Sequence, residues 1–264
     1  MAAAPDSAEL RLLGARATSA LAGREMRRVL GLWTQTVLPP VVTGVIFLAI
    51  FGGALGGRLP SVAGLSYARF ILPGLLVMTV AGQAFANNST SLFQAKNEGY
   101  IDDVLTSPLR AWQLVLAYMT GGLLRGWLAA LALALIASPF AGAPSDPMLL
   151  IAALCLTGLV FAALGVITGT WADTFDQHAF IANLIITPLA LLGGVFYAAE
   201  RLQQPWRTLT RADPLYYLVD ATRQGWAGVH ETSILAALLV ALAVAGSVFA
   251  LAVALVRRGW RLKP

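Results

Sequence analysis

Six long apolar stretches follow one another along the chain, and short polar segments separate them. We place them at about residues 37–56, 70–88, 114–138, 148–171, 179–199 and 233–256. Each is close to or above the roughly 18 residues that a helix needs to cross the hydrocarbon layer of a bilayer. Apolar and polar residues do not alternate along them, as they would in a membrane β-barrel. The pattern therefore predicts an all-α polytopic membrane protein with six transmembrane helices.

The segment before the first span has a different, amphipathic pattern. In residues 1–36, Leu13 and Leu21 fall on one face of a helix, while Arg24 stays on the polar side. We expect this segment to be a cytoplasmic helix that lies in the membrane interface. Residues 37–264 then form the six-span transmembrane domain. A soluble helix that packs on the rest of the protein is the alternative.

A second non-spanning region joins the last two spans. Asp213 has the chemistry of a helix N-cap, and Pro214 suits the first helical position. Pro205 gives the same start signal a few residues earlier. We expect two short helices at about residues 205–226, at the outer face or dipping into it, which is tolerated where such helices are buried in protein.

Composition agrees with a membrane location. Hydrophobic residues make up 58% of the 264 residues, mean hydropathy is +0.74, and only 12% are charged, against roughly 25% in soluble domains. The net charge of +5 comes from arginines at the membrane edges, so it does not indicate a nucleic-acid partner. Cys155 is the only cysteine, which excludes an internal disulfide.

Lysines and arginines are distributed unevenly over the two sides that six spans define. The N-terminal segment, the segment between the second and third spans, and the C-terminal tail together carry eleven, against six on the opposite side. Short segments rich in Lys and Arg stay in the cytoplasm, so both termini are predicted to be cytoplasmic. The segment between the last two spans strains this rule, because it has four arginines yet is placed outside.

The sequence shows no recognisable catalytic motif. Lys96 and Lys263 are the only lysines, and neither lies in the Gly-Lys-Ser/Thr context of a phosphate-binding loop. His178 and His230 are far apart and no HExxH motif occurs, so we expect neither a metal site nor an enzyme. An intramembrane enzyme would need paired acids, a Ser–His pair or a metal cluster. An ion-gradient-driven secondary transporter or channel stays open as an alternative, although few acids lie within the spans to couple to protons.

A charged residue lies deep in the third span. Arg125 is about eleven residues from its start, where a charge is costly and is usually paired or faces an aqueous path. We predict either a role in a substrate path or gate, or a structural pair with an amide or carbonyl of a neighbouring helix. Its candidate partners are Gln83, Asn87 and Asn183. The candidate substrate path consists of Gln83, Asn87, Arg125, Asn183, Phe196 and Tyr197.

The segment NEGYIDDVLTSPLR, residues 97–110, concentrates charge between the second and third spans. Three of the thirteen acids of the chain fall within six residues of it: Glu98, Asp102 and Asp103. Two helical turns are expected here, with apolar residues on one side: Ile101, Val104 and Leu105. The Ser-Pro pair at residues 107–108 predicts the start of the third span's helix. Such a segment suits a docking surface, and a solvated loop is the alternative.

These segments resemble a known family. EGYIDDVLTSPLRAWQLVLAYMTGGLLRG resembles the region of the second and third spans of ABC-2 type exporter permeases. FDQHAFIANLIITPLALLGGVFY and, further on, ADPLYYLVDATRQGWAG resemble that family's fifth span and outer helices. The resemblance runs across most of the chain, is weakest in the first 35 residues, and is closest to the nodulation-factor and drug-exporter branch.

The resemblance implies a permease subunit that exports an amphipathic, lipid-, glycan- or drug-like substrate from the bacterial cytoplasm across the inner membrane. It implies a homodimer surrounded by membrane lipids, and a separate ATPase subunit that binds ATP and magnesium in place of this chain. It also implies that the segment at about residues 97–107 is the coupling helix that receives the ATPase stroke. The residues carried over for this role are Asn97, Glu98, Gly99, Tyr100, Ile101, Asp102, Asp103, Val104 and Leu105.

Overall fold

The computed structural model describes residues 7–54 and 64–262, and all regular structure in these ranges is helical. Residues 1–6, 55–63 and 263–264, with Arg58 and Lys263, lie outside the described residues. Within these ranges, six helical segments are long and apolar enough to span a membrane, which confirms the predicted fold class. They run over Trp33–Gly53, Tyr67–Asn97, Ala111–Ala141, Pro147–Trp171, Phe175–Leu192 and Ile234–Arg257.

Two of these spans, the first and the fifth, are built from shorter pieces. The full order is α1 Ser7–Gly31, α2 Trp33–Thr36, α3 Leu38–Leu48, η1 Ala49–Ala54, α4 Tyr67–Asn97, α5 Ile101–Thr106, α6 Ala111–Ala141, α7 Pro147–Trp171, α8 Phe175–Ile181, η2 Ala182–Ile186, α9 Thr187–Leu192, η3 Ala199–Arg201, α10 Trp206–Ala212, α11 Pro214–Ala227 and α12 Ile234–Arg257. The π-helical turns η1 and η2 lie inside the first and fifth spans.

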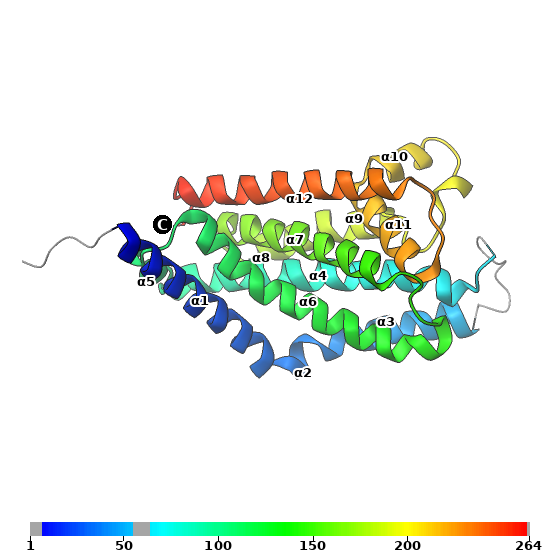
Figure 1. Cartoon of the computed structure of the whole chain (residues 1–264), viewed down its shortest axis with the longest axis horizontal. Coiled ribbons are helices and arrows are strands. Elements are labelled where there is room, and N and C mark those ends of the chain that lie inside the picture. Colours follow the sequence, from blue (N-terminus) through cyan, green and yellow to red (C-terminus); the bar gives the residue numbers. More distant parts are fainter. Residues whose placement is uncertain (1–6, 55–63, 263–264) are drawn as a thin grey trace, which may run out of the picture.

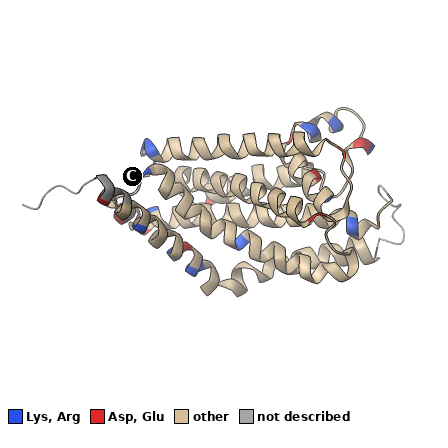
Figure 2. Cartoon of the chain, viewed as in Figure 1, with Lys and Arg blue, Asp and Glu red and all other residues tan. Residues whose placement is uncertain are grey.

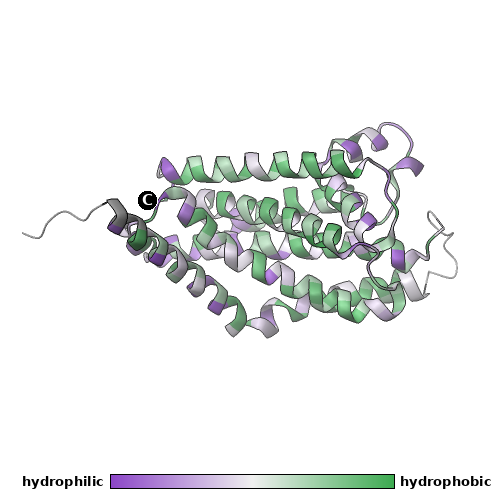
Figure 3. Cartoon of the chain, in the orientation of Figure 1, coloured by the Kyte–Doolittle hydropathy of each residue, from purple (hydrophilic) through white to green (hydrophobic). Residues whose placement is uncertain are grey.

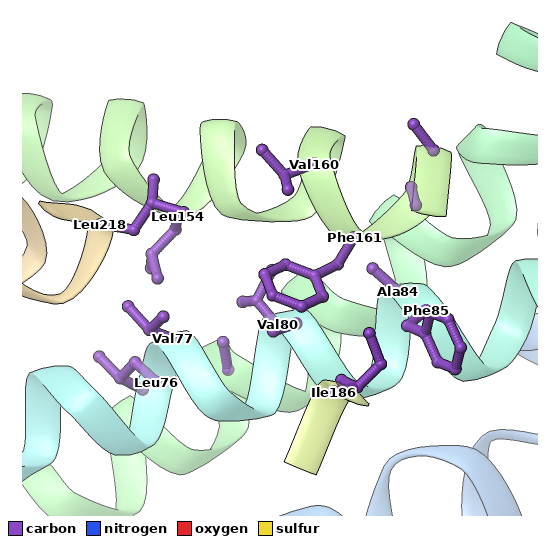
Figure 4. Close-up of a cluster of buried hydrophobic side chains, with 14 of the residues drawn as sticks. Leu76, Val77, Val80, Ala84, Phe85, Leu154, Val160, Phe161, Ile186 and Leu218 are labelled. Carbon is purple, nitrogen blue, oxygen red and sulfur yellow. The ribbon is translucent and has the colours of Figure 1, made fainter. Parts of the chain in front are cut away.

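Helix α4 is the centre of the bundle. Of the residues in its spanning window, 72% are buried, against 22% in that of α12. Figure 4 shows Leu76, Val77 and Val80 of α4 facing Leu154 and Phe161 of α7. These side chains form the middle of one continuous apolar core.

Glycines allow the two neighbouring helices to approach α4 closely. A side-chain carbon added at Gly122 of α6 would lie 2.7 Å from the carbonyl oxygen of Ala84. One added at Gly165 of α7 would lie 2.6 Å from that of Phe85. Both distances are shorter than carbon–oxygen contact allows. These small residues therefore serve packing within the chain.

The two ends of the bundle differ. At one end, named here the termini end, lie α1, α5 and the C-terminal end of α12; at the other, the far end, lie α10 and α11 (Figure 1). Charged residues gather at both ends and along α1, while the long helices are mainly hydrophobic (Figures 2 and 3). Both ends of the described chain thus lie on one side, as six spans require. Which side faces the cytoplasm stays a prediction.

The fifth span ends earlier than the predicted residue 199. Helix α9 stops at Leu192, and Gly193 and Gly194 follow, the latter with a φ of +75°. That conformation favours glycine and turns the chain away from the helix axis. Phe196 and Tyr197 therefore lie in the irregular segment after the span, and the prediction that they belong to its helix is wrong.

The start of the third span also differs from the prediction. Ser107 does not cap it: its hydroxyl donates to the carbonyl oxygen of Val104 and so closes α5. Helix α6 begins at Ala111, and the backbone N–H of Arg110 donates to Oε1 of Gln113 at 2.9 Å. The prediction that residues 107–108 start this helix is wrong, because the Ser-Pro pair ends the preceding helix.

Candidate functional site

Helix α5 projects from the termini end on a glycine turn. Helix α4 stops at Asn97, and Gly99 follows with a φ of +79°, which separates α4 from α5. Asn97, Glu98 and Gly99 are exposed, as are Asp102 and Asp103 in the first turn of α5. An exposed acidic surface therefore lies where the sequence predicted one. Its carboxylates suit the positive end of the α5 dipole.

The apolar side of α5 points inward. Ile101 is 3% exposed and Val104 is 8% exposed, and both belong to the main core; Leu105 is half-buried. In this conformation Ile101 and Val104 are not available to fill a groove in a partner protein. They anchor α5 to the transmembrane helices instead.

Helix α1 lies against α5. The guanidinium of Arg24 stacks over the ring of Tyr100 at 5.0 Å. A depression of about 270 Å³ separates the two helices, with Leu21 and Arg24 on one wall and Asp103 and Val104 on the other. The termini end therefore offers a charged, notched surface made from two segments far apart in the sequence.

A buried acid that the sequence analysis missed lies on the inner face of α1. Glu25 is 1% exposed, and its carboxylate lies 3.0 Å from Arg24 and 3.2 Å from Arg28. The hydroxyl of Ser91 on α4 donates to it at 2.7 Å. One signal was present in the sequence: Glu25 is a lone acid three residues before Arg28 in an otherwise basic stretch.

From Arg28, polar contacts continue through the bundle. Arg28 donates to Oδ1 of Asn87 at 3.1 Å, and Asn87 donates to Oδ1 of Asn88 at 3.2 Å. Asn88 donates to the carbonyl of Ala162 on α7 and accepts from the backbone N–H of Gly122 on α6. We call Glu25, Arg28, Asn87, Asn88 and Ser91 the buried polar network. It joins α1 to three transmembrane helices.

This arrangement corrects the expected role of Asn87. The side chain is 2% exposed, and its partners are Arg28 and Asn88. It therefore neither pairs with Arg125 nor lines a substrate path in this conformation. Asn183 lies exposed on η2 and makes no hydrogen bond to Arg125 within the described residues.

Arg125 is hydrogen-bonded to Gln83, one of its three predicted partners. Its Nε donates to Oε1 of Gln83 on α4 at 2.8 Å. Arg125 lies midway along α6, which runs from Ala111 to Ala141. Both side chains line a pocket of about 360 Å³ between α3, α4 and α6, which we call the Arg125 pocket.

The walls of the Arg125 pocket combine apolar and hydroxyl groups. The apolar lining includes Phe47, Leu75 and Met78, and Thr43 and Thr79 add hydroxyls. Phe196 packs its ring 5.5 Å from that of Phe47, so it supports this wall from behind. A cavity of this kind accommodates a molecule with an apolar body and a polar group.

Tyr197 has a different position from the one predicted. Its hydroxyl donates to the carbonyl of Leu192 at 2.6 Å and lies 3.1 Å from the hydroxyl of Thr210 on α10. It therefore fastens the end of the fifth span to α10 and does not line the Arg125 pocket. A gate at this position would have to move α10 with it.

The far end holds a buried ion pair. Arg223 on α11 is 1% exposed, donates to the carbonyl of Gly194 at 2.7 Å and lies 3.8 Å from the carboxylate of Glu231. Its guanidinium stacks over the ring of Phe70 at 4.1 Å. The charge of Arg223 is neutralised inside the protein. One of the four arginines between the fifth and sixth spans, which do not fit the rule that such segments stay in the cytoplasm, is therefore not exposed to water.

The helix start at Asp213 is confirmed. Its carboxylate accepts the backbone N–H of Leu215 at 2.8 Å, and Pro214 is the first residue of α11. Burial raises the pKa of this carboxyl to about 6, although the bond from Leu215 opposes the shift. The second carboxylate oxygen is buried with no hydrogen-bond partner within the described residues.

Comparison with known proteins gives a family context for this geometry. The profile of the ABC-2 type transporter family matches residues 16–226. Inner membrane transport permease YadH of Escherichia coli K12 is 31% identical over 241 residues, which cover 91% of this chain and 94% of that protein. Nodulation protein J of Neorhizobium galegae is 25% identical over 186 residues, 70% of this chain and 71% of that protein. Nodulation protein J of Rhizobium leguminosarum bv. trifolii is 28% identical over 182 residues, with 68% and 69% covered.

Proposed function

The chain belongs to the ABC-2 type transporter family, and from this premise we propose that it is the membrane subunit of an ATP-driven exporter. It lies in the bacterial inner membrane, the location that the name of the Escherichia coli relative, inner membrane transport permease YadH, gives for that protein. A separate ATPase subunit binds and hydrolyses ATP. Family membership favours this function over the ion-gradient-driven transporter or channel.

The exposed acidic surface of α5 carries the proposal. Glu98, Asp102 and Asp103 stand at the termini end, next to the depression between α1 and α5. Basic or polar groups of the ATPase meet these carboxylates, and one of its side chains enters the depression. The termini end is then the cytoplasmic side, in agreement with its excess of Lys and Arg.

A push on α5 has two routes into the bundle. Because Ile101 and Val104 pack in the main core, a displacement of α5 moves the core directly. The same displacement moves Tyr100, which contacts Arg24 on α1. The neighbour of Arg24, Glu25, is the first residue of the buried polar network. Both routes reach α4 and α6, which line the Arg125 pocket. ATP binding in the partner thus changes the shape of a cavity suited to an amphipathic substrate.

Assembly completes the transport path. The first, fifth and sixth spans have at most 22% of their spanning windows buried within the chain. Exposed leucines and isoleucines cover them, among them Ile46, Leu184 and Leu242. We infer that membrane lipids and a second copy of the permease cover these faces in a homodimer.

The test reverses charge on α5. The double variant Asp102→Lys, Asp103→Lys should lose most co-purification with the cognate ATPase, and ATP turnover of the assembled complex should fall with it. Asp176→Lys is the matched control, because Asp176 is an exposed acid at the start of α8. Wild-type assembly and turnover in the α5 variant would refute the docking role of these carboxylates.

A further inference from the structure

Arg125 has no anionic partner within the described residues. Its hydrogen bond to Gln83 uses only Nε, and no carboxylate lies within ion-pair distance. The side chain is partly buried, at residue 15 of the 31 in α6. An arginine at such depth is expensive unless a counter-charge or water compensates it. We therefore expect a group from another molecule to balance the positive charge of Arg125.

The guanidinium also has unused donors. Arginine carries five N–H groups in a planar fork, and the two terminal nitrogens hold four of them. In Arg125 these nitrogens make no hydrogen bond to the described residues. A fork of this kind binds oxyanions such as phosphate, sulfate or carboxylate through paired hydrogen bonds. Nε is already held by Gln83, which fixes the plane of the group.

The surrounding walls indicate what carries the oxyanion. Phe47, Leu75 and Met78 line the Arg125 pocket with apolar groups, and Thr43 and Thr79 supply hydroxyls near them. A small inorganic ion would leave the apolar walls unused. An alkyl or acyl chain attached to the oxyanion would cover them and gain burial energy.

We propose that the Arg125 pocket binds the oxyanion group of an anionic amphiphile, and that the substrate of the exporter belongs to this class. The identification of the bound molecule as substrate rests on the proposed function. Gln83 holds the guanidinium in position, and the hydroxyl of Thr79 donates to a remaining oxygen of the anion. The hydroxyl of Thr43 is already used, because it donates to the carbonyl of Pro39 at 3.0 Å.

The position of the pocket links binding to the ATPase side. Gln83 and Asn87 are four residues apart on α4, so they lie on the same face one turn from each other. Asn87 belongs to the buried polar network that begins at Glu25. A shift of α1 or α4 that reorganises this network moves Gln83, and with it the orientation of Arg125. Release of the anion is thereby tied to the state of the termini end.

Binding to the purified permease tests the inference without the ATPase. The permease is placed in nanodiscs of zwitterionic phosphatidylcholine, and equilibrium binding of radiolabelled hexadecyl phosphate is measured. The expected loss of affinity in Arg125→Gln is roughly tenfold to a hundredfold, since the bond to a charged group is lost. Arg125→Lys keeps the positive charge without the planar fork, so its affinity should lie between those of the wild type and Arg125→Gln. Arg257→Gln removes one positive charge from an exposed site on α12 and should bind as the wild type does.

Two competition experiments keep the result independent of the variant's folding. Unlabelled hexadecanol has the same chain without the anion and should compete at least tenfold less well against the wild type. Inorganic phosphate should compete poorly, because it leaves the apolar walls empty. Equal competition by the alcohol overturns the oxyanion role, and equal competition by inorganic phosphate overturns the amphiphile. If Arg125→Gln binds hexadecyl phosphate with wild-type affinity, the Arg125 pocket is not the binding site. Failure of the ATPase to assemble would refute the proposed function and leave this binding result intact.

Discussion

At the scale of single residues, some buried polar side chains have hydrogen-bond or ion-pair partners and others have unpaired atoms. Glu25 lies between two arginines and a serine hydroxyl. One oxygen of the Asp213 carboxylate, in contrast, is buried with no hydrogen-bond partner among the residues that the structure describes. A buried group without a partner destabilises the fold when it is charged. Its protonation should therefore be visible in the stability of the protein.

Asp213 should make the free energy of unfolding depend on pH. Its folded pKa of about 6 is above its unfolded value, so its contribution is fully present below the unfolded pKa and is lost as pH rises through 6. Asp213→Asn keeps the bond from Leu215 and should be more stable than the wild type by about 1–3 kcal/mol at pH 7.5. Thermal unfolding in detergent between pH 4 and pH 8 measures the difference.

The matched control is Asp146→Asn. Asp146 also caps a helix, accepting the N–H of Leu149 at 3.0 Å, but it is exposed. The advantage of Asp213→Asn should disappear at pH 4, and Asp146→Asn should give no such gain at pH 7.5. An identical pH profile for the wild type and Asp213→Asn would show that folding does not raise the pKa of this carboxyl.

Residue-scale contacts set the limit of what the sequence could predict. Gln83 was a sound candidate for Arg125, because a deep arginine needs an amide or an acid on a neighbouring helix. The fate of Asn87 was not predictable from the pattern. It depends on how α1 packs on α4, and Arg28 and Asn87 are 59 residues apart. Glu25 was missed for the same reason, since its burial depends on this packing.

At the scale of elements, close packing of the helices depends on glycines, which have no side chain. Gly165→Ala places a carbon 2.6 Å from the carbonyl oxygen of Phe85, so α7 has to move away from α4. We expect a destabilisation of roughly 1–3 kcal/mol, as for other overpacked cores. The midpoint of thermal unfolding in detergent should fall accordingly.

Gly246→Ala on α12 is the control for this substitution. Apart from the adjacent residues and the nearby backbone of α12 itself, no atom of the described residues lies within 4 Å of the carbon that it adds. Alanine also favours a helix over glycine by up to about 1 kcal/mol. The two glycine variants should therefore change stability in opposite directions. A neutral effect of Gly165→Ala would mean that α4 and α7 separate at little cost.

Element boundaries were predicted well where apolar length determined them and poorly where turn chemistry did. The fourth span, from residue 147 to 171, agrees with the expected 148–171. The fifth ends seven residues early, because Gly193 and Gly194 stop the helix although the apolar run continues. The start of α6 was misplaced because Ser107 closes α5 instead.

At the scale of the whole molecule, six spans place α1, α5 and the end of α12 together (Figure 1). The proposed orientation puts this end in the cytoplasm. In a Cys155→Ser background, Gln203→Cys at the far end should react with a membrane-impermeant maleimide in intact cells. Glu98→Cys should react only after the membrane is opened. Both positions are exposed in the chain. The reverse labelling pattern would invert the topology and place α5 out of reach of a cytoplasmic ATPase.

The buried ion pair at the far end has a consequence for biogenesis. Asp220, Arg223 and Glu231 come from one stretch of twelve residues, and Asp220 accepts the backbone N–H groups of Glu231 and Thr232. Short loops close at little entropic cost. The charges of this stretch can thus neutralise one another soon after they leave the insertion machinery, before the last span has joined the bundle. An arginine that ends almost fully buried therefore need not cross the bilayer far from its counter-ion.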